Sequence, residues 1–517
     1  MPTEMQDVLV IGSGFGGSIA ASRLVDAGVK VTLLERGPWR NSLATRSMGI
    51  AERAPFPQGW RMYNYALRNT NLPFIGGRNL MLNRKGMFEF FRGNGLWMLC
   101  SSGVGGGSHV YGGLHQRPLR DDFWDGHCDG LSSELMEPHY QSIMQHFGSR
   151  ELTEADGIPN TAKEVFKDSP LFTHDNPLVH PALGVLMPKV PGSPKPVVTE
   201  DGIKRHEMQR CNAMHILGSA DSAKSTLDFI YLAEAMRKGL NILDMHEACL
   251  IRRIKDNGTD CFEVDMRDRH HGRNLTMRAK RLILAAGTLN TLRLLLASRA
   301  AGGLQGMPQL GKRLGSNGDT FGAWLTTDPD CDHSAGLMSG IDFRENPTGL
   351  YLVYGPVAGL DELKIPGFLK HRFSRYASFT GMGEDAADGE VTWNKGRIKV
   401  DYDASNSPIF SQFYQAFDRI KAGTGHGVGT LKNPPLTVHQ CGGACVGQTI
   451  DNGVVDVRGE VFDNPGLYIT DASALPGAVG GPPSMSVAAW SSFVAQQFVD
   501  SAGQPPMPVQ EMLADAS

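Results

Sequence analysis

The chain has 517 residues, 41% hydrophobic and 20% charged, which at roughly 100–200 residues per domain allows two or three domains with a buried core. The formal net charge is −4 and no basic stripe runs along the chain, so we expect no nucleic acid as a partner. No apolar run reaches membrane-spanning length and the N-terminus has no signal-peptide pattern, so we expect a cytoplasmic protein with reduced thiols.

The first predicted unit consists of a strand, a glycine turn, a helix and a second strand. Residues 7–11 read DVLVI, a β-branched run typical of a strand buried on both faces. GSGFGG follows at 12–17, then apolar residues at helical spacing, then VKVTLLE at 29–35. This order within about 30 residues is that of a dinucleotide-binding βαβ unit.

Each of the glycines and the acidic residue in this unit has a physical purpose. Gly12 permits the tight turn, Gly14 lets the backbone approach a pyrophosphate, and Gly17 lets the helix pack closely on the strand. The helix N-terminus offers N–H groups and a partial positive charge to phosphates. Glu35 ends the second strand, where its carboxylate can accept hydrogen bonds from ribose hydroxyls and would repel a 2′-phosphate, which argues against NADP.

A second glycine-rich segment, SSGVGGGSHVYGGLHQRP, spans residues 101–118. Glycines at this density exclude a regular helix or strand and allow the backbone to lie against a flat ring system or to wrap phosphates. Val104, Val110 and Tyr111 are interleaved with the glycines, which favours a packed wall over a flexible surface loop.

Further along, residues 240–254 and 262–268 are predicted to be paired strands. RLILAAGTLNTLRLLLAS at 281–298 predicts a strand, a glycine turn and an amphipathic helix, like a second crossover on the nucleotide side. Near the C-terminus, residues 464–477 predict a strand that ends in Asp471, and a helix is predicted to begin near Ser484, after two prolines. Its N–H groups could stabilise negative charge on a ligand.

The segments between these pieces, 120–210 and 300–435, contain strand-like runs such as FGAWLTT, GLYLVYG and RIKVDYD. They predict a separate antiparallel sheet that roofs the ligand. Eight cysteines are scattered, and only Cys441 and Cys445 lie close together. The spacing of that pair is compatible with a disulfide or a metal site. No second ligand pair has suitable spacing, so we expect packing roles for the cysteines and no metal site.

Five of these pieces together resemble a known family. GSGFGG with Glu35, GVGGGSHVYGG (103–113), LAAGTLNTLRLL (284–295), HQCGGACVG (439–447) and LYITDASALPGAVGGPPSMSVAA (467–489) occur in the order of the glucose–methanol–choline (GMC) oxidoreductases, with most similarity to the cholesterol-oxidase-like branch. The resemblance implies an α/β FAD-binding Rossmann-like domain, made of residues 1–119, 211–299 and 436–517, plus an inserted α+β substrate domain, 120–210 and 300–435, with an antiparallel sheet.

The resemblance also implies the chemistry. An enzyme of this family oxidises an alcohol to a carbonyl by hydride transfer to N5 of FAD, and the reduced flavin passes electrons to oxygen or another acceptor. The apolar, Met-rich inserts favour a bulky apolar alcohol such as a sterol or steroid. His109 is one residue away from the family's covalent linking position, so FAD is expected to bind non-covalently. The residues expected to contact FAD are Gly12, Ser13, Gly14, Phe15, Gly16, Gly17, Glu35, Arg36, Gly103, Val104, Gly106, Gly107, Ser108, Val110, Tyr111, Gly112, Gly113, Ala248, Ala286, Gly287, Asp471, Ala472, Pro483, Ser484 and Met485.

Three positions bear on catalysis. His439, before a Gly-Gly pair, matches the family histidine over the flavin and can accept or orient a hydroxyl proton near pH 7. The family's second residue, Asn or His, is replaced by Pro482, which has no side-chain donor, so Ser484, Tyr111 or His109 is a candidate partner and isomerase or lyase chemistry is the alternative. Asp361, in AGLDE, matches an acid that cholesterol oxidases use for proton transfer.

Overall fold

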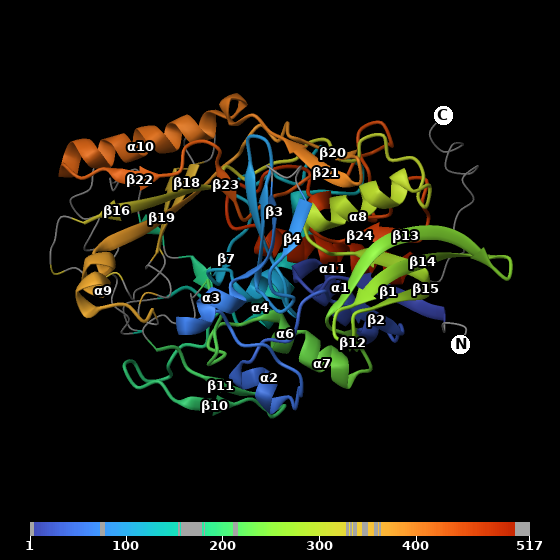
Figure 1. The fold of residues 1–517 in the computed structure, drawn as a ribbon, viewed down its shortest axis with the longest axis horizontal. Coiled ribbons are helices and arrows are strands. Elements are labelled where there is room, and N and C mark those ends of the chain that lie inside the picture. The colour runs from blue at the N-terminus through green and yellow to red at the C-terminus, as the bar shows by residue number, and fades with distance from the viewer. Residues whose placement is uncertain are drawn as a thin grey trace.

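The computed structural model describes residues 5–72, 78–152, 156, 178–179, 181–209, 216–326, 330, 333, 339–343, 350–355, 360 and 363–501. Two larger assemblies are separated along the long axis of the molecule (Figure 1). One contains a mixed sheet with the N-terminal unit, and the other contains an antiparallel sheet beneath a long helix. This arrangement confirms the predicted fold class, a Rossmann-like α/β part and an α+β part with an antiparallel sheet.

The mixed sheet has the strand order β12-β2-β1-β15-β14-β13, and β24 pairs with β15. β1 lies between β2 and β15 and is parallel to both, whereas β13, β14 and β15 form an antiparallel meander, as predicted for residues 240–268. The bounds of these strands are β1 Met5–Ile11, β2 Val31–Leu34, β12 Asn241–Leu243, β13 His246–Asp256, β14 Thr259–Asp268, β15 Arg273–Leu284 and β24 Leu467–Ile469.

Glycines allow the first helix, α1 (Phe15–Asp26), to lie close to this sheet. Gly12 has φ +103°, a left-handed conformation that side chains rarely adopt. A Cβ on Gly17 would lie 1.8 Å from the carbonyl oxygen of Gly12, so only glycine permits this approach. The structure therefore agrees with the prediction that Gly17 lets the helix pack closely on the strand.

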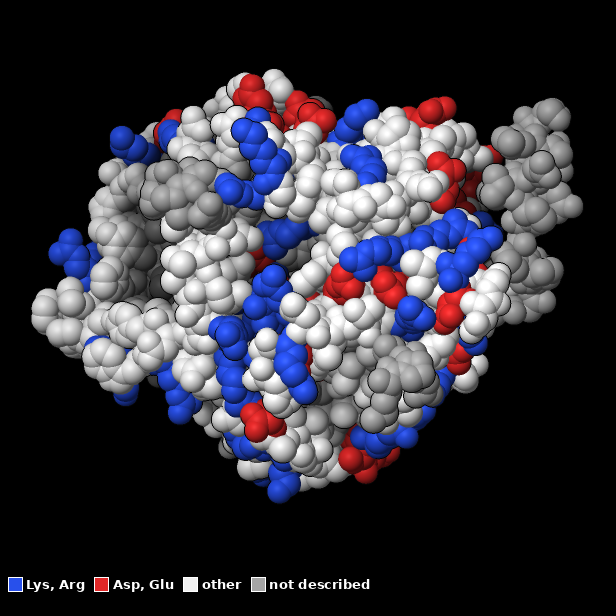
Figure 2. All heavy atoms as spheres, turned by 45° about the vertical axis from the view of Figure 1, so that its right-hand side comes forward, with Lys and Arg blue, Asp and Glu red and all other residues white. Residues whose placement is uncertain are grey.

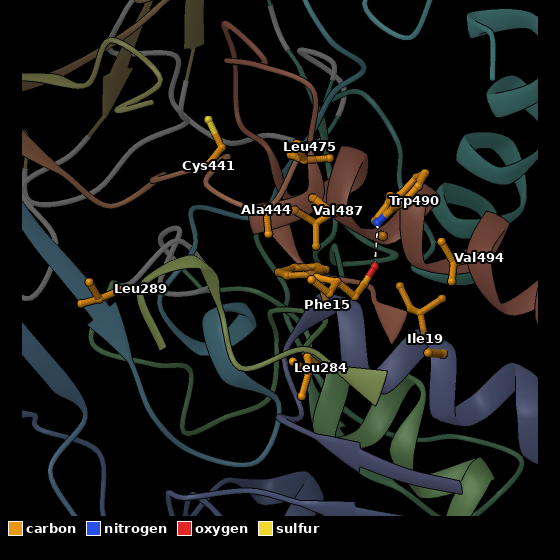
Figure 3. Packing of buried hydrophobic residues seen from close by; sticks show 14 of the residues in the cluster. Phe15, Ile19, Leu284, Leu289, Cys441, Ala444, Leu475, Val487, Trp490 and Val494 are labelled. Atoms are coloured by element: carbon orange, nitrogen blue, oxygen red, sulfur yellow. Dashed lines mark hydrogen bonds between the residues drawn. The ribbon is translucent and has the colours of Figure 1, made fainter. Parts of the chain in front are cut away.

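The C-terminal helix α11 (Ser484–Ser501) packs on α1. Figure 3 shows Trp490 and Val494 of α11 facing Ile19 of α1, with Phe15 and Val487 nearby. The Trp490 indole N–H donates to the carbonyl of Ile469 at 3.0 Å, which ties α11 to β24. Residues from both ends of the chain therefore build one core.

The antiparallel sheet has the order β22-β16-β19-β18-β17-β8, and the amphipathic helix α10 (Pro408–Thr424) lies along it (Figure 1). Its strands are β8 Leu178–Val179, β16 Thr320–Leu325, β17 Ser339–Phe343, β18 Leu350–Gly355, β19 Tyr376–Met382 and β22 Val428–Thr430. The prediction that RIKVDYD joins this sheet was wrong. β21 (Arg397–Asp401) pairs with β20 (Glu390–Asn394), in a separate hairpin that contacts α8 (Thr288–Ala300).

A third sheet, β23-β6-β5-β3-β4, lies between these two assemblies in Figure 1. Its strands are β3 Leu67–Leu72, β4 Arg78–Met81, β5 Phe88–Arg92, β6 Trp97–Ser101 and β23 Leu436–Thr437. The remaining elements are α2 Leu43–Ser47, α3 Met62–Tyr65, β7 Leu114–His115, α4 Ser133–His146, β9 Ala182–Leu183, β10 Pro196–Val198, β11 Lys204–His206, α6 Leu227–Ile230, α7 Leu232–Arg237 and α9 Gly367–Ser374.

The strands of the mixed sheet fall in the segments assigned to the FAD-binding domain, and those of the antiparallel sheet fall in the segments assigned to the substrate domain. The exact boundaries stay a prediction. None of the helices in the described ranges has the length and hydrophobicity of a bilayer span. On the face shown in Figure 2, basic and acidic side chains are interspersed.

Candidate active site

A cavity of about 960 Å³ is bounded by all three sheets and by the start of α11. It reaches from the first glycine turn to His439. The residues predicted to contact a cofactor that line it are Gly12, Ser13, Gly14, Phe15, Gly16, Glu35, Arg36, Gly106, Gly107, Val110, Tyr111, Gly112, Ala248, Ala286, Gly287, Asp471, Ala472, Pro483 and Ser484. The structure thus gathers on one cavity wall residues that are up to several hundred positions apart in sequence.

Six other predicted contact residues lie behind this wall: Gly17, Gly103, Val104, Ser108, Gly113 and Met485. Val104 is fully buried and its N–H donates to the carbonyl of Pro38. The hydroxyl of Ser108 donates to the carbonyl of Gly105 at 2.7 Å. These residues support the cavity wall from within the protein. Their contact with a cofactor stays a prediction.

The dinucleotide end of the cavity fits a pyrophosphate. A Cβ on Gly14 would meet nothing within 4 Å, so the backbone there borders open space. α1 starts at Gly14 without a side-chain cap, which leaves its N-terminal N–H groups available to an anion. The Glu35 carboxylate is 5% exposed and accepts hydrogen bonds from the backbone and hydroxyl of Ser13, at 3.1 and 2.7 Å, beside this space.

A buried charge cluster borders the same end of the cavity. Glu89 is 1% exposed and accepts from Arg36 and from Arg293, each at 2.7 Å. Although burial disfavours the carboxylate, the charges of Arg293 and Arg36 hold the pKa of Glu89 well below its usual range. Both arginines line the cavity, so this cluster presents positive charge to an anionic ligand.

The middle of the cavity is closed by the turn at residues 286–291 and by the C-terminal strand end. Asp471 accepts from the N–H of Gly287 at 2.9 Å and from the hydroxyl of Thr291 at 2.5 Å, and burial raises its pKa. The side-chain oxygen of Gln440 is buried there without a protein partner among the described residues, as is that of Asn69. Both side chains line the cavity and would be satisfied by polar edges of a bound ligand.

The second glycine-rich segment is fixed from behind by Lys224. Its ammonium donates to the carbonyls of His109 and Tyr111, at 2.7 and 2.8 Å. The His109 ring hydrogen-bonds through Nε2 to the carbonyl of Val104 at 2.6 Å, is 2% exposed and does not line the cavity. The Tyr111 hydroxyl donates to the carbonyl of Ser225 at 2.6 Å. Neither side chain therefore offers a free polar atom to the cavity.

His439 follows β23 and lines the other end of the cavity. Its Nδ1 lies 2.8 Å from a carboxylate oxygen of Asp319, and the side chain of Asp319 is fully buried. The cavity that His439 lines is also lined by apolar side chains, among them Leu114, Phe321, Val353, Met382 and Val438. A hydroxyl carried by an apolar molecule can therefore be brought to the imidazole.

Pro482 also lines this end, at the position where the family's second polar residue was expected. The adjacent turn is fixed by Asn317, whose amide donates to the carbonyl of Gly481 at 3.0 Å and accepts from the N–H of Gly480 at 2.9 Å. Ser484 lines the cavity, but its hydroxyl donates to the carbonyl of Leu114 at 3.3 Å. Asp361, the acid in AGLDE, lies outside the described residues.

Sequence reasoning missed Asp319 and Asn317. Both belong to the turn SNGD at 316–319, before β16. The Asn-Gly pair signals a turn but carries no information about its partners. Because Asp319 and His439 are 120 positions apart, no local pattern joins them.

A dinucleotide cradle, a second glycine-rich wall and a histidine beneath an apolar roof define this protein as an FAD-dependent alcohol oxidoreductase. Sequence models described as GMC oxidoreductase match residues 6–317 and 426–491, and the chain belongs to that family. The resemblance stated from the sequence is thereby confirmed.

Individual relatives are distant. A cholesterol oxidase of Mycobacterium tuberculosis is 26% identical, over 95% of this chain and 90% of its own length. A long-chain-alcohol oxidase of Arabidopsis thaliana is 23% identical, over 96% of this chain and 68% of its own length. The crystal structure of pyridoxine 4-oxidase from Mesorbium loti shares the fold, with a TM-score of 0.60 at 17% identity, over 95% of this chain and 99% of that one.

Proposed function

We propose that this protein oxidises the hydroxyl group of a bulky, apolar alcohol of sterol-like or similar hydrophobic character to a carbonyl, using non-covalently bound FAD. The observation that carries the proposal is the position of His439, which lies between an apolar roof and the dinucleotide cradle within one cavity. That relatives include a cholesterol oxidase and a long-chain-alcohol oxidase supports a hydrophobic substrate.

Bound FAD would supply the hydride acceptor and the route for electrons to oxygen or another acceptor. Gly14 and the start of α1 would hold its pyrophosphate, Glu35 its ribose, and the segment 106–112 the flat ring system. His439 takes or orients the hydroxyl proton, because its Nε2 has no protein partner among the described residues. The apolar roof excludes water from the reacting hydroxyl.

Non-covalent attachment is supported by His109, whose ring faces Val104 and Phe56 and not the cavity. Acid precipitation of the purified holoprotein is expected to release all the flavin absorbance into the supernatant. Flavin that stays with the precipitated protein would show a covalent link and would contradict this part of the proposal.

The experiment that tests the reaction is anaerobic addition of alcohols from a steroid, terpenoid and aryl panel, with the flavin bands recorded. Bleaching with a bulky apolar alcohol is expected, and His439→Gln should abolish it. His426→Gln is the matched control, because that ring bonds to the carbonyl of Leu325 and does not line the cavity. Peroxide release in air, compared with dye reduction under nitrogen, then separates an oxidase from a dehydrogenase.

A second candidate is an isomerase or lyase on the same fold. Pro482 favours it, because this residue lines the cavity and cannot hydrogen-bond a substrate oxygen. Conversion of a substrate with no change in flavin redox state would establish this candidate in place of the first.

A further inference from the structure

The carboxylate of Asp319, next to His439, is held in place by several hydrogen bonds. One oxygen of Asp319 faces Nδ1 of His439 at 2.8 Å. The other accepts from the Thr437 hydroxyl and the Val438 N–H, each at 2.8 Å, and from the His439 N–H at 3.2 Å. The N–H groups of Val438 and His439 can only donate, so the arrangement suits a negative carboxylate.

This geometry determines which nitrogen of His439 is the base. A carboxylate can only accept, so Nδ1 carries the proton in the neutral ring. The lone pair then resides on Nε2, the ring nitrogen that has no hydrogen-bond partner in the described part of the chain. An asparagine in place of Asp319 could donate to Nδ1, which would reverse the tautomer and block Nε2 with a proton.

We propose that Asp319 is the positioning residue of the active site: it holds His439 with Nε2 ready to accept a proton, and its charge stabilises the imidazolium that results. The inference rests on the proposed alcohol oxidation. In that step the O–H bond breaks and its proton moves to Nε2, while the C–H bond breaks and its electron pair leaves as hydride to FAD, so the alcohol is oxidised and FAD reduced. The Asp319 carboxylate stabilises the protonated imidazole, which the side chain of Pro482 cannot do because it has no polar atom.

Two other titratable groups interact with Asp319. Asp385 accepts from the Ser316 hydroxyl and the Tyr402 hydroxyl, both at 2.8 Å, and burial raises its pKa. Cys441 is fully buried, which raises its thiol pKa well above the usual value and keeps it neutral. Neither makes a hydrogen bond to the imidazole, so Asp385→Asn is a control that changes a neighbouring buried carboxyl group without touching the His439 ring.

The test compares Asp319→Asn, Asp385→Asn and Thr437→Val in the FAD-loaded enzyme. Asp319→Asn is expected to lower kcat by ~10²- to ~10⁴-fold, the usual contribution of a general base, with KM changed little. A fall in kcat without a matching change in KM is the result expected when a positioning residue is lost but substrate binding is kept. The Asp385→Asn enzyme should keep the wild-type kcat and KM.

A second readout does not depend on turnover. Low-field proton NMR of the wild type should show an Nδ1–H resonance that disappears in His439→Gln and Asp319→Asn and persists in Asp385→Asn. If Asp319→Asn does not fold, the resonance is followed in the wild type and in Thr437→Val, where it should shift but remain. An Asp319→Asn enzyme with the wild-type kcat and a retained resonance would overturn the assignment. If the wild type oxidises no alcohol, the function fails, while the resonance still tests the pair.

Discussion

The substitution Gly14→Ala separates cofactor binding from folding. Gly14 has φ −72° and ψ −164°, which any residue adopts, and its new Cβ would meet no protein atom within 4 Å. The apoprotein should therefore unfold at an unchanged urea concentration. The methyl group would instead occupy the cradle proposed for the pyrophosphate. Overpacking of one methyl group costs ~1–3 kcal/mol, which corresponds to a ~5- to ~150-fold rise in the Kd for FAD.

The assay is titration of apoprotein with FAD, followed by quenching of the flavin fluorescence. Gly477→Ala is the matched control: its Cβ also meets nothing within 4 Å, but the residue does not line the cavity, so its Kd should equal that of the wild type. Equal FAD affinities for Gly14→Ala and wild type would refute the placement of the pyrophosphate. A lower urea midpoint for apo Gly14→Ala would refute the reasoning about open space.

Three further predictions concern stability, each measured by urea unfolding. Burial lowers the pKa of His115 to about 3, so the unfolded chain takes up the proton first; as pH falls from 6.5 toward 3, the free energy of unfolding should drop by up to ~1.4 kcal/mol per pH unit, and by less in His115→Gln. Glu89→Gln leaves Arg36 and Arg293 without their carboxylate and should cost ~3–5 kcal/mol; a loss below ~1 kcal/mol would mean that the pair is not effectively buried. Asn317 has φ +56°, so Asn317→Ala should cost more than Asn317→Gly, because both lose two hydrogen bonds but only alanine is strained; equal losses would contradict the strain argument.

Local signals predicted the nucleotide-binding half of this fold well. The strand at 7–11, the glycine turn and the helix start near Ser484 are encoded by neighbouring residues, through β-branched runs, φ-permissive glycines and prolines before a helix. The RIKVDYD run shows the limit of such signals. Its alternating residues do form a strand, but which sheet a strand joins depends on pairing with distant residues.

In the candidate site too, local sequence predicts one residue but not its distant partner. His439 could be predicted from the motif HQCGG, yet the residue that orients it is supplied by a turn 120 positions earlier. Nothing in the turn SNGD distinguishes a surface acid from one that is fully buried against an imidazole. The departure at Pro482 was visible in the sequence, but its consequence depends on which other groups the fold brings to the same place.

The turn at 316–319 connects these observations. Within four residues it bonds to two parts of the candidate site: Asp319 bonds to the imidazole of His439, and Asn317 bonds to the Gly480–Gly481 backbone next to Pro482. A displacement of this turn would therefore move His439 and the backbone next to Pro482 together. Because the side chain of Pro482 makes no hydrogen bond, the proposed reaction relies on His439 and on the apolar cavity lining to orient the substrate hydroxyl. Such a site should discriminate substrates by the shape of the apolar body more than by polar groups near the hydroxyl, since the cost of a misplaced methylene in an apolar pocket is ~1–3 kcal/mol.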